Sequence, residues 1–123
     1  MQFRVELCTV MKYRVVVTRP ALQSLETIER KYHRAIRDAI TENLIRKPAV
    51  PTRNRKMLDP AIFGATWELR CGPGNRYRVL YELLEGEDDE AGERVVQVLL
   101  FGEKIGAQLF VMGQSVTPLE EEL

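Results

Sequence analysis

One stretch, residues 66–84, constrains the fold more than any other part of the chain. It reads TWELRC, then GPGN, then RYRVLYELL, so apolar and polar side chains alternate on both sides of a glycine-rich turn. Alternation with a period of two is typical of a strand with one buried face, and Gly-Pro-Gly-Asn supplies turn residues. The stretch therefore predicts a β-hairpin. The mostly apolar run RVVQVLLF, residues 94–101, predicts a further, central strand.

The N-terminal third predicts a strand followed by helices. Residues 12–18, KYRVVVT, alternate as a strand would. A helix is expected to begin near Thr18, which can cap it, with Pro20 in the first turn. Residues 19–47 then predict an antiparallel helical hairpin or one long bent helix, because apolar residues recur at helical spacing until Pro48 ends the helical region (Leu22, Leu25, Ile28, Tyr32, Ile36, Ile40 and Leu44).

The order of these elements predicts an α+β fold. We expect the N-terminal helical hairpin to pack on one face of a small antiparallel sheet, mixed only where the first strand inserts beside a later one. Residues 48–64 contain three prolines and are expected to form a loop, while residues 103–112 are expected to form a short helix or a last strand. The predicted domain spans residues 12–113. Residues 1–11 are then an extension or an extra strand, and residues 114–123 an acidic tail.

The charges of the chain are divided between its two parts. There are 18 basic and 18 acidic residues, but residues 1–84 hold 16 basic and 8 acidic residues, whereas residues 85–123 hold 2 and 10. The zero total is therefore a sum of +8 and −8. Such asymmetry indicates either a polyanion-binding region with a separate acidic segment, or two solvated faces of one fold.

Several classes of function find no support in the sequence. No apolar stretch reaches the ~18 residues that a membrane span needs, and the N-terminus does not resemble a secretory signal. No P-loop, GxGxxG motif or metal-ligand spacing appears, so no metal or cofactor is expected. Cys8 and Cys71 form no CxxC pair, which favours a reducing cytoplasm, and His33 is interpreted as a surface residue.

Basic residues gather around the predicted hairpin. Arg70, Arg76 and Arg78 are expected to share one face of the two strands, since alternate residues of a strand face the same way. The basic group Arg53, Arg55 and Lys56 precedes the hairpin, and Lys104 follows the central strand. Arginine forks bind phosphate oxygens in a bidentate manner, so this arrangement predicts a polyanion site. The alternative is that these side chains are solvated, or pair with Glu68, Glu82 and the acidic loop 85–93.

The hairpin also resembles a known family. The segment WELRCGPGNRYRVLYEL, residues 67–83, resembles the signature hairpin of the RelE/ParE toxin superfamily. Other segments resemble that family in the same order, so that the resemblance covers roughly residues 12–112: KYRVVVTRPALQSL, a helical pair ending at KP, RNRKML and VLLFGEK. It implies a RelE/ParE-like fold and a toxin that pairs with a cognate antitoxin protein.

The resemblance implies two kinds of activity. RelE-like toxins cleave mRNA on the ribosome without a metal, by attack of the ribose 2′-hydroxyl on the adjacent phosphate, whereas ParE-like toxins inhibit DNA gyrase. Arg78 matches the family's catalytic arginine, and Arg70 and Lys104 match other basic positions. Two positions differ: Glu68 stands where a basic residue is common, and Phe110 where a tyrosine is common. The expected function is therefore a ribosome-dependent mRNA endonuclease. The alternatives are a gyrase inhibitor and a non-toxic member that only binds an antitoxin.

The endonuclease hypothesis gives each group of basic residues a role. In the endonuclease, Arg78, Arg70 and Lys104 would stabilise the reacting phosphate, and Arg53, Arg55, Lys56 and Arg76 would bind RNA. The positive part of the chain would then form a concave RNA- or antitoxin-binding face, with the acidic loop and tail away from it. A loop 85–93 folded over Arg70 and Arg78 would instead mask the site.

Overall fold

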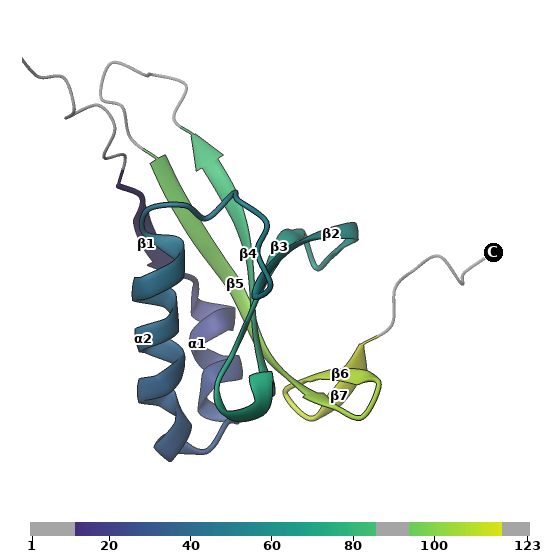
Figure 1. Ribbon diagram of the computed structural model, residues 1–123. Helices are drawn as coiled ribbons and strands as arrows, with labels where there is room; N and C mark the ends of the chain where they lie inside the picture. The colour runs from purple at the N-terminus through teal and green to yellow at the C-terminus, as the bar shows by residue number, and fades with distance from the viewer. Residues whose placement is uncertain (1–11, 86–93, 117–123) are drawn as a thin grey trace, which may run out of the picture.

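The computed structural model describes residues 12–85 and 94–116, and the predictions made for residues 1–11, for most of the acidic loop and for the end of the tail lie outside this part of the chain. Within these described residues, two α-helices and seven strands form the fold, and Figure 1 shows their arrangement. Their bounds are β1 Arg14–Val17, α1 Arg19–Glu26, α2 His33–Leu44, β2 Arg55–Ile62, β3 Ala65–Cys71, β4 Tyr77–Glu85, β5 Arg94–Ile105, β6 Gln108–Val111 and β7 Gln114–Val116. Short 3₁₀ turns lie at Arg30–Tyr32 and Pro73–Asn75.

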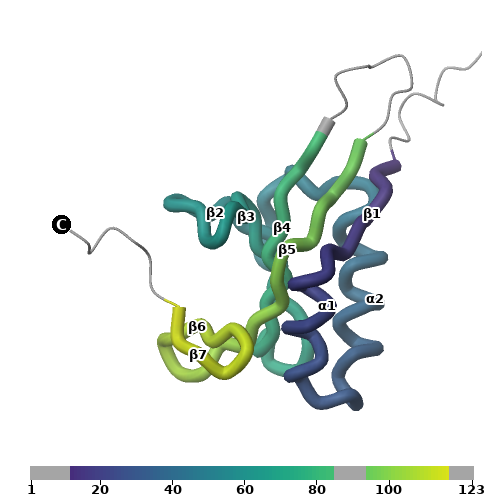
Figure 2. The backbone as a smooth tube through the Cα atoms, turned by 180° about the vertical axis from the view of Figure 1, so that it is seen from behind, coloured from purple at the N-terminus to yellow at the C-terminus, as the bar shows by residue number. Residues whose placement is uncertain are grey.

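All seven strands belong to one sheet. Strands β2 to β7 pair with their sequence neighbours in antiparallel ladders, while β1 pairs with β5 in parallel, with Arg14 opposite Val95. The long strand β5 has room for two partners on one edge, since β1 takes residues Val95 to Val98 and β6 takes Glu103 to Ile105. Figure 2 shows β6 and β7 turning away from the helices at the far end of β5.

The predicted fold class is wrong. We expected a helical hairpin on one face of a small sheet, but 48% of the described residues are in strands and 27% in helices, and the sheet curls into an antiparallel half-barrel with only two short helices. Helix α1 ends at Glu26, and α2 runs only from His33 to Leu44. The predicted helical region, residues 19–47, therefore holds two short helices with a break between them. The sheet is larger because β2 occupies part of the proline-containing segment assigned to a loop, and because β6 and β7 extend it beyond β5.

Local interactions fix where α1 begins and how it meets the sheet. Thr18 caps the helix, because its hydroxyl accepts a hydrogen bond from the Ala21 amide at 3.2 Å. On the buried side of α1, the Ser24 hydroxyl accepts a hydrogen bond from the amide of Phe101 in β5 at 2.9 Å. The helix is thereby held against the middle of β5, over which the core forms.

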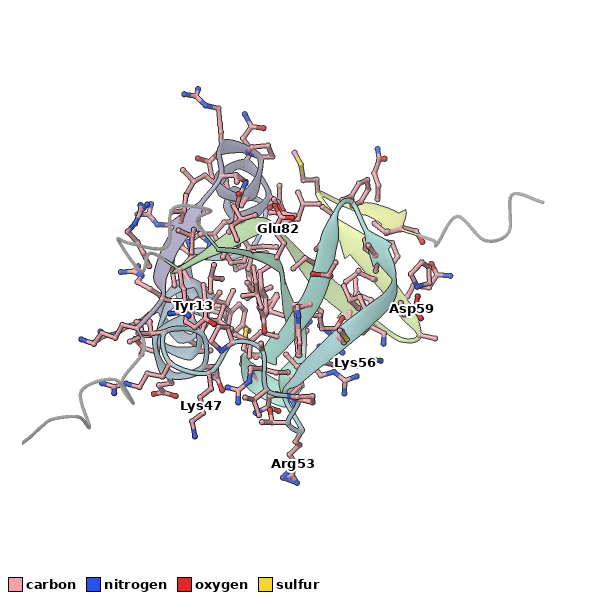
Figure 3. All side chains as sticks on the ribbon, turned by 90° about the horizontal axis from the view of Figure 1, so that it is seen from above. Tyr13, Lys47, Arg53, Lys56, Asp59 and Glu82 are labelled. Atoms are coloured by element: carbon pink, nitrogen blue, oxygen red, sulfur yellow. The ribbon has the colours of Figure 1, made fainter. Side chains whose placement is uncertain are left out.

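The two faces of the sheet differ in character. The core of the protein lies on the face that the helices cover and includes Leu69, Tyr77, Val79, Tyr81 and Val98, all buried. Strand side chains between these positions point to the other face, which is the inside of the half-barrel and is called the concave face below. Figure 3, which looks along the sheet, shows β2 and the C-terminal strands on either side of this concave face.

Candidate functional site: a cation cluster on the concave face

Three basic side chains and one carboxylate meet on the concave face. Arg70 of β3 lies directly opposite Arg78 of β4, and Arg78 lies opposite Gly102 of β5, two residues before Lys104. The Oε2 atom of Glu68 lies 3.2 Å from the Nε of Arg70 and 3.4 Å from the Nε of Arg78. Two guanidinium groups therefore share one carboxylate oxygen.

Arg78 is the most constrained member of this cluster. Its side chain is 8% exposed, against 33% for Arg70. One terminal nitrogen donates hydrogen bonds to the backbone carbonyls of Asn75 and Tyr77, which tie the side chain to the β3–β4 turn. Burial lowers the pKa of Arg78, and the nearby Arg70 lowers it further, while Glu68 acts in the opposite direction. An additional anion at this place would therefore stabilise the charged arginine.

The cluster carries an excess of positive charge. Glu68 offsets one of the three cations Arg70, Arg78 and Lys104, which leaves a formal +2. Within the described part of the chain, the side chain of Lys104 makes no ion pair. The side chain of Lys56 adds a further exposed cation, because Lys56 lies opposite Glu68 in the β2–β3 ladder and so shares its face.

A cavity of about 270 Å³ opens at this cluster. Glu68, Arg78 and Lys104 form its charged wall, and Ile62, Leu109 and Val116 are among its apolar residues. Because Ile62 belongs to β2 and Val116 to β7, the cavity spans the two ends of the curled sheet. A small anion such as a phosphate group fits the charge and the size of this cavity, which we call the cation pocket.

The other predicted site residues lie elsewhere. Arg53 is exposed in the loop before β2 and extends away from the domain (Figure 3). Arg55 is buried and braces that loop, because its guanidinium donates hydrogen bonds to the carbonyls of Val50 and Asn43 at 2.8 and 2.9 Å. Arg76 was expected beside Arg78, but it lies in the turn before β4 and pairs with Glu103 at 3.0 Å.

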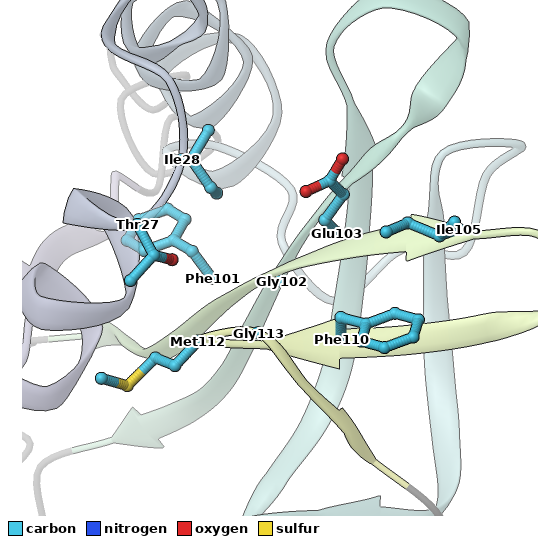
Figure 4. Close-up of a pocket in the computed structure, with 9 residues that line it drawn as sticks. All are labelled: Thr27, Ile28, Phe101, Gly102, Glu103, Ile105, Phe110, Met112 and Gly113. Carbon is cyan, nitrogen blue, oxygen red and sulfur yellow. The ribbon is translucent and has the colours of Figure 1, made fainter.

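Phe110 faces away from the cation pocket. It lies opposite Glu103 and lines a separate cavity of about 380 Å³ between β5, β6 and the end of α1, with Thr27, Ile28 and Phe101 (Figure 4). The charged residue in the lining of that cavity is Glu103, which is paired with Arg76. The lining of this cavity therefore includes no cation for a phosphate, and Phe110 is not among the residues that line the cation pocket.

Sequence reasoning offered pairing of the arginines with Glu68 as the alternative to a polyanion site, but it did not predict that one oxygen of Glu68 would serve both Arg70 and Arg78. The alternation in TWELRC does place Glu68 and Arg70 on one face, and the register of the hairpin then brings Arg78 beside them. Reading the two strands as a paired ladder would have predicted the shared carboxylate. The contribution of Ile62 and Val116 depends on the curl of the sheet, for which the sequence pattern carries no comparable signal.

The chain matches no family model, and neither the curated proteins nor the solved structures include a significant match to it. Among the residues of the structure, no helix is long and apolar enough to cross a membrane. The same residues contain no group of three or more His, Cys, Asp or Glu side chains that could hold a metal ion.

Proposed function

We propose that this chain is the toxin of a toxin–antitoxin pair and cleaves mRNA on the ribosome in the cytoplasm. The observation that carries the proposal is the pairing of one carboxylate, Glu68, with two arginines, of which Arg78 lines a pocket together with Glu68 and Lys104. RNA cleavage through the 2′-hydroxyl needs a proton acceptor and cations around one phosphate, and no other described cavity combines them. The resemblance of residues 67–83 to the toxin hairpin supports the same reading.

Each residue of the cation pocket has a role in the proposed reaction. The Glu68 carboxylate takes the proton from the ribose 2′-hydroxyl, whose oxygen then attacks the adjacent phosphorus. Arg70 and Arg78 donate hydrogen bonds to the phosphate oxygens, where negative charge increases in the transition state. The ammonium of Lys104 stabilises the departing 5′-oxygen, which takes a proton from water, and the proton held by Glu68 returns to the solvent. The products are a 2′,3′-cyclic phosphate and a 5′-hydroxyl end.

The pocket explains why an acidic residue can stand among phosphate-binding cations. A lone carboxylate would repel the phosphate, but Glu68 lies against two guanidinium groups that leave the pocket positive overall. Binding of the phosphate brings the arginines a second anionic partner. It also places the carboxylate close to the ribose that carries the attacking hydroxyl.

The proposal is tested by inducing the chain in cells while growth and mRNA integrity are followed. We expect growth arrest with mRNA cleaved within codons, and neither effect for Arg78→Ala. Arg37→Ala is the matched control, because Arg37 is an exposed arginine of helix α2 on the opposite side of the sheet from the pocket, and this variant should arrest growth as the parent chain does. Growth arrest with intact mRNA, together with inhibition of supercoiling by purified DNA gyrase, would contradict the proposal and favour the gyrase alternative.

A further inference from the structure

Two hairpin tips place large apolar side chains in an unusual backbone conformation. The β2–β3 hairpin turns through Phe63 and Gly64, with φ values of 51° and 85°, and the β6–β7 hairpin turns through Met112 and Gly113, with φ values of 54° and 81°. Two-residue turns with positive φ at both positions favour Asn, Asp or Gly at the first position. Phenylalanine and methionine are disfavoured there.

Neither the Phe63 nor the Met112 side chain is buried in the core. Phe63 is 64% exposed and Met112 is 49% exposed. A residue that is both conformationally strained and exposed adds little to stability, so its presence at a turn points to a contact made by the folded protein. The same combination occurs at two separate turns.

Both tips border one groove on the concave face. This groove has a volume of about 990 Å³. Its lining includes Phe63, Met112 and four apolar strand residues, Leu99, Leu100, Val111 and Val116, and it extends to Thr18 and Pro20 at the start of α1. The groove is continuous with the cation pocket, since Val116 lines both and Ile62 of the pocket is followed directly by Phe63 of the groove. A ligand whose phosphate lies in the cation pocket therefore has the group next to that phosphate at the mouth of an apolar groove.

We propose that this groove binds the nucleobase next to the scissile phosphate, with Phe63 and Met112 closing on the base from the two hairpin tips. This inference rests on the proposed function. A nucleobase has apolar faces that stack on aromatic side chains, and single-stranded RNA can turn its bases outward to reach them. The rim of the groove also offers a polar group to the edge of the base, the side-chain amide of Gln114, which lies opposite Val111.

The groove can be tested apart from the phosphate pocket. The substitutions Phe63→Asn and Met112→Asn suit positive φ, so both variants should fold and melt at or above the temperature of the parent chain. Their affinity is measured by fluorescence anisotropy with a short single-stranded RNA made uncleavable by 2′-O-methyl groups. We expect each variant to bind this RNA on the order of tenfold more weakly. Met57→Gln is the control, because Met57 is an exposed methionine outside the groove, and its affinity should not change.

A second RNA with one abasic position identifies what the groove holds. If the groove binds a base, the parent chain and Phe63→Asn should bind the abasic RNA equally well. If Arg78→Ala weakens RNA binding but Phe63→Asn and Met112→Asn do not, the groove inference is wrong and the phosphate site stands. The groove is then left as a surface for a protein segment. If the parent chain does not bind the intact RNA, the groove inference fails, whereas the proposed function is judged separately by cleavage of mRNA on the ribosome.

Discussion

Arg70 and Arg78 face each other across the β3–β4 ladder, and their Nε atoms lie 3.2 and 3.4 Å from the same oxygen of Glu68. Two like charges directly opposite each other in a sheet destabilise it, so this pair depends on an anion between them. Glu68 supplies one negative charge for two arginines. A substrate phosphate would supply the second negative charge. The predictions below depend on this shortage of negative charge around the two arginines.

Glu68→Gln should separate binding from cleavage. The amide keeps the shape of the side chain but can neither take a proton nor neutralise the arginines, so cleavage should fall on the order of 10²–10⁴-fold. Affinity for the uncleavable RNA should rise, because one negative charge has left the pocket. Glu82→Gln removes a carboxylate from β4 outside the cation pocket and should cleave as the parent chain does. Unchanged cleavage by Glu68→Gln would exclude the carboxylate as the base.

Arg78→Ala should affect both folding and activity, whereas Arg70→Ala should affect mainly activity. The Arg78 side chain holds the β3–β4 turn through two backbone carbonyls, so its loss should cost roughly 1–3 kcal/mol in urea unfolding. Loss of either arginine should slow cleavage on the order of 10²–10³-fold. Arg70 is more exposed, and its removal should change the free energy of unfolding by less than about 1 kcal/mol. Equal losses of stability for the two variants would contradict these roles.

Arg55 should matter for stability and not for RNA. Its side chain donates to the carbonyls of Val50 and Asn43, and Arg55→Met would leave these acceptors without their partner. We expect a loss of roughly 1–3 kcal/mol in the free energy of unfolding. Affinity for the uncleavable RNA should not change. Arg53→Ala, two residues away and exposed, should stay within about 0.5 kcal/mol of the parent chain. Weaker RNA binding by a folded Arg55→Met chain would restore its predicted RNA-binding role.

The sequence predicted the hairpin of the candidate site well. Alternation in residues 66–71 and 76–84 places Arg70 and Arg78 on one face, and the structure pairs them across the ladder. Arg76 was misplaced because β4 begins only at Tyr77, so the period of two does not extend back to Arg76. A simple alternation rule fails where a strand ends.

The remainder of the fold depends on long-range packing. Strand β2 includes Pro60, which sequence rules assign to a loop, but β2 is an edge strand with a shifted register between Met57 and Ile62, where proline is tolerated. The curl that brings Val116 near Ile62 comes from the whole sheet and not from any one segment. Arg55 looked like a ligand-binding cation, because no sequence pattern shows that its guanidinium is turned inward to the carbonyls of Val50 and Asn43.

Cys71 should be an unreactive thiol. Burial raises its pKa to about 12, so almost none of it is thiolate at pH 8. In a Cys8→Ser chain, a thiol reagent should modify Cys71 only after unfolding in urea. The raised pKa also implies that Cys71 contributes to stability fully below its unfolded pKa near 9, and that this contribution is lost as the pH rises towards 12. Rapid modification of the folded chain at pH 8 would contradict the buried position.

The central claim is that Glu68, Arg70, Arg78 and Lys104 cleave RNA through its own 2′-hydroxyl. The most direct measurement is cleavage of a defined mRNA on ribosomes in a reconstituted translation system, followed by analysis of the new RNA ends. The account predicts a 2′,3′-cyclic phosphate and a 5′-hydroxyl from the parent chain, cleavage slowed on the order of 10²–10³-fold by Arg78→Ala, and no cleavage where the mRNA carries a 2′-deoxyribose at the cut position. Cleavage of the deoxyribose-containing mRNA, or an mRNA left intact by the parent chain, would contradict it.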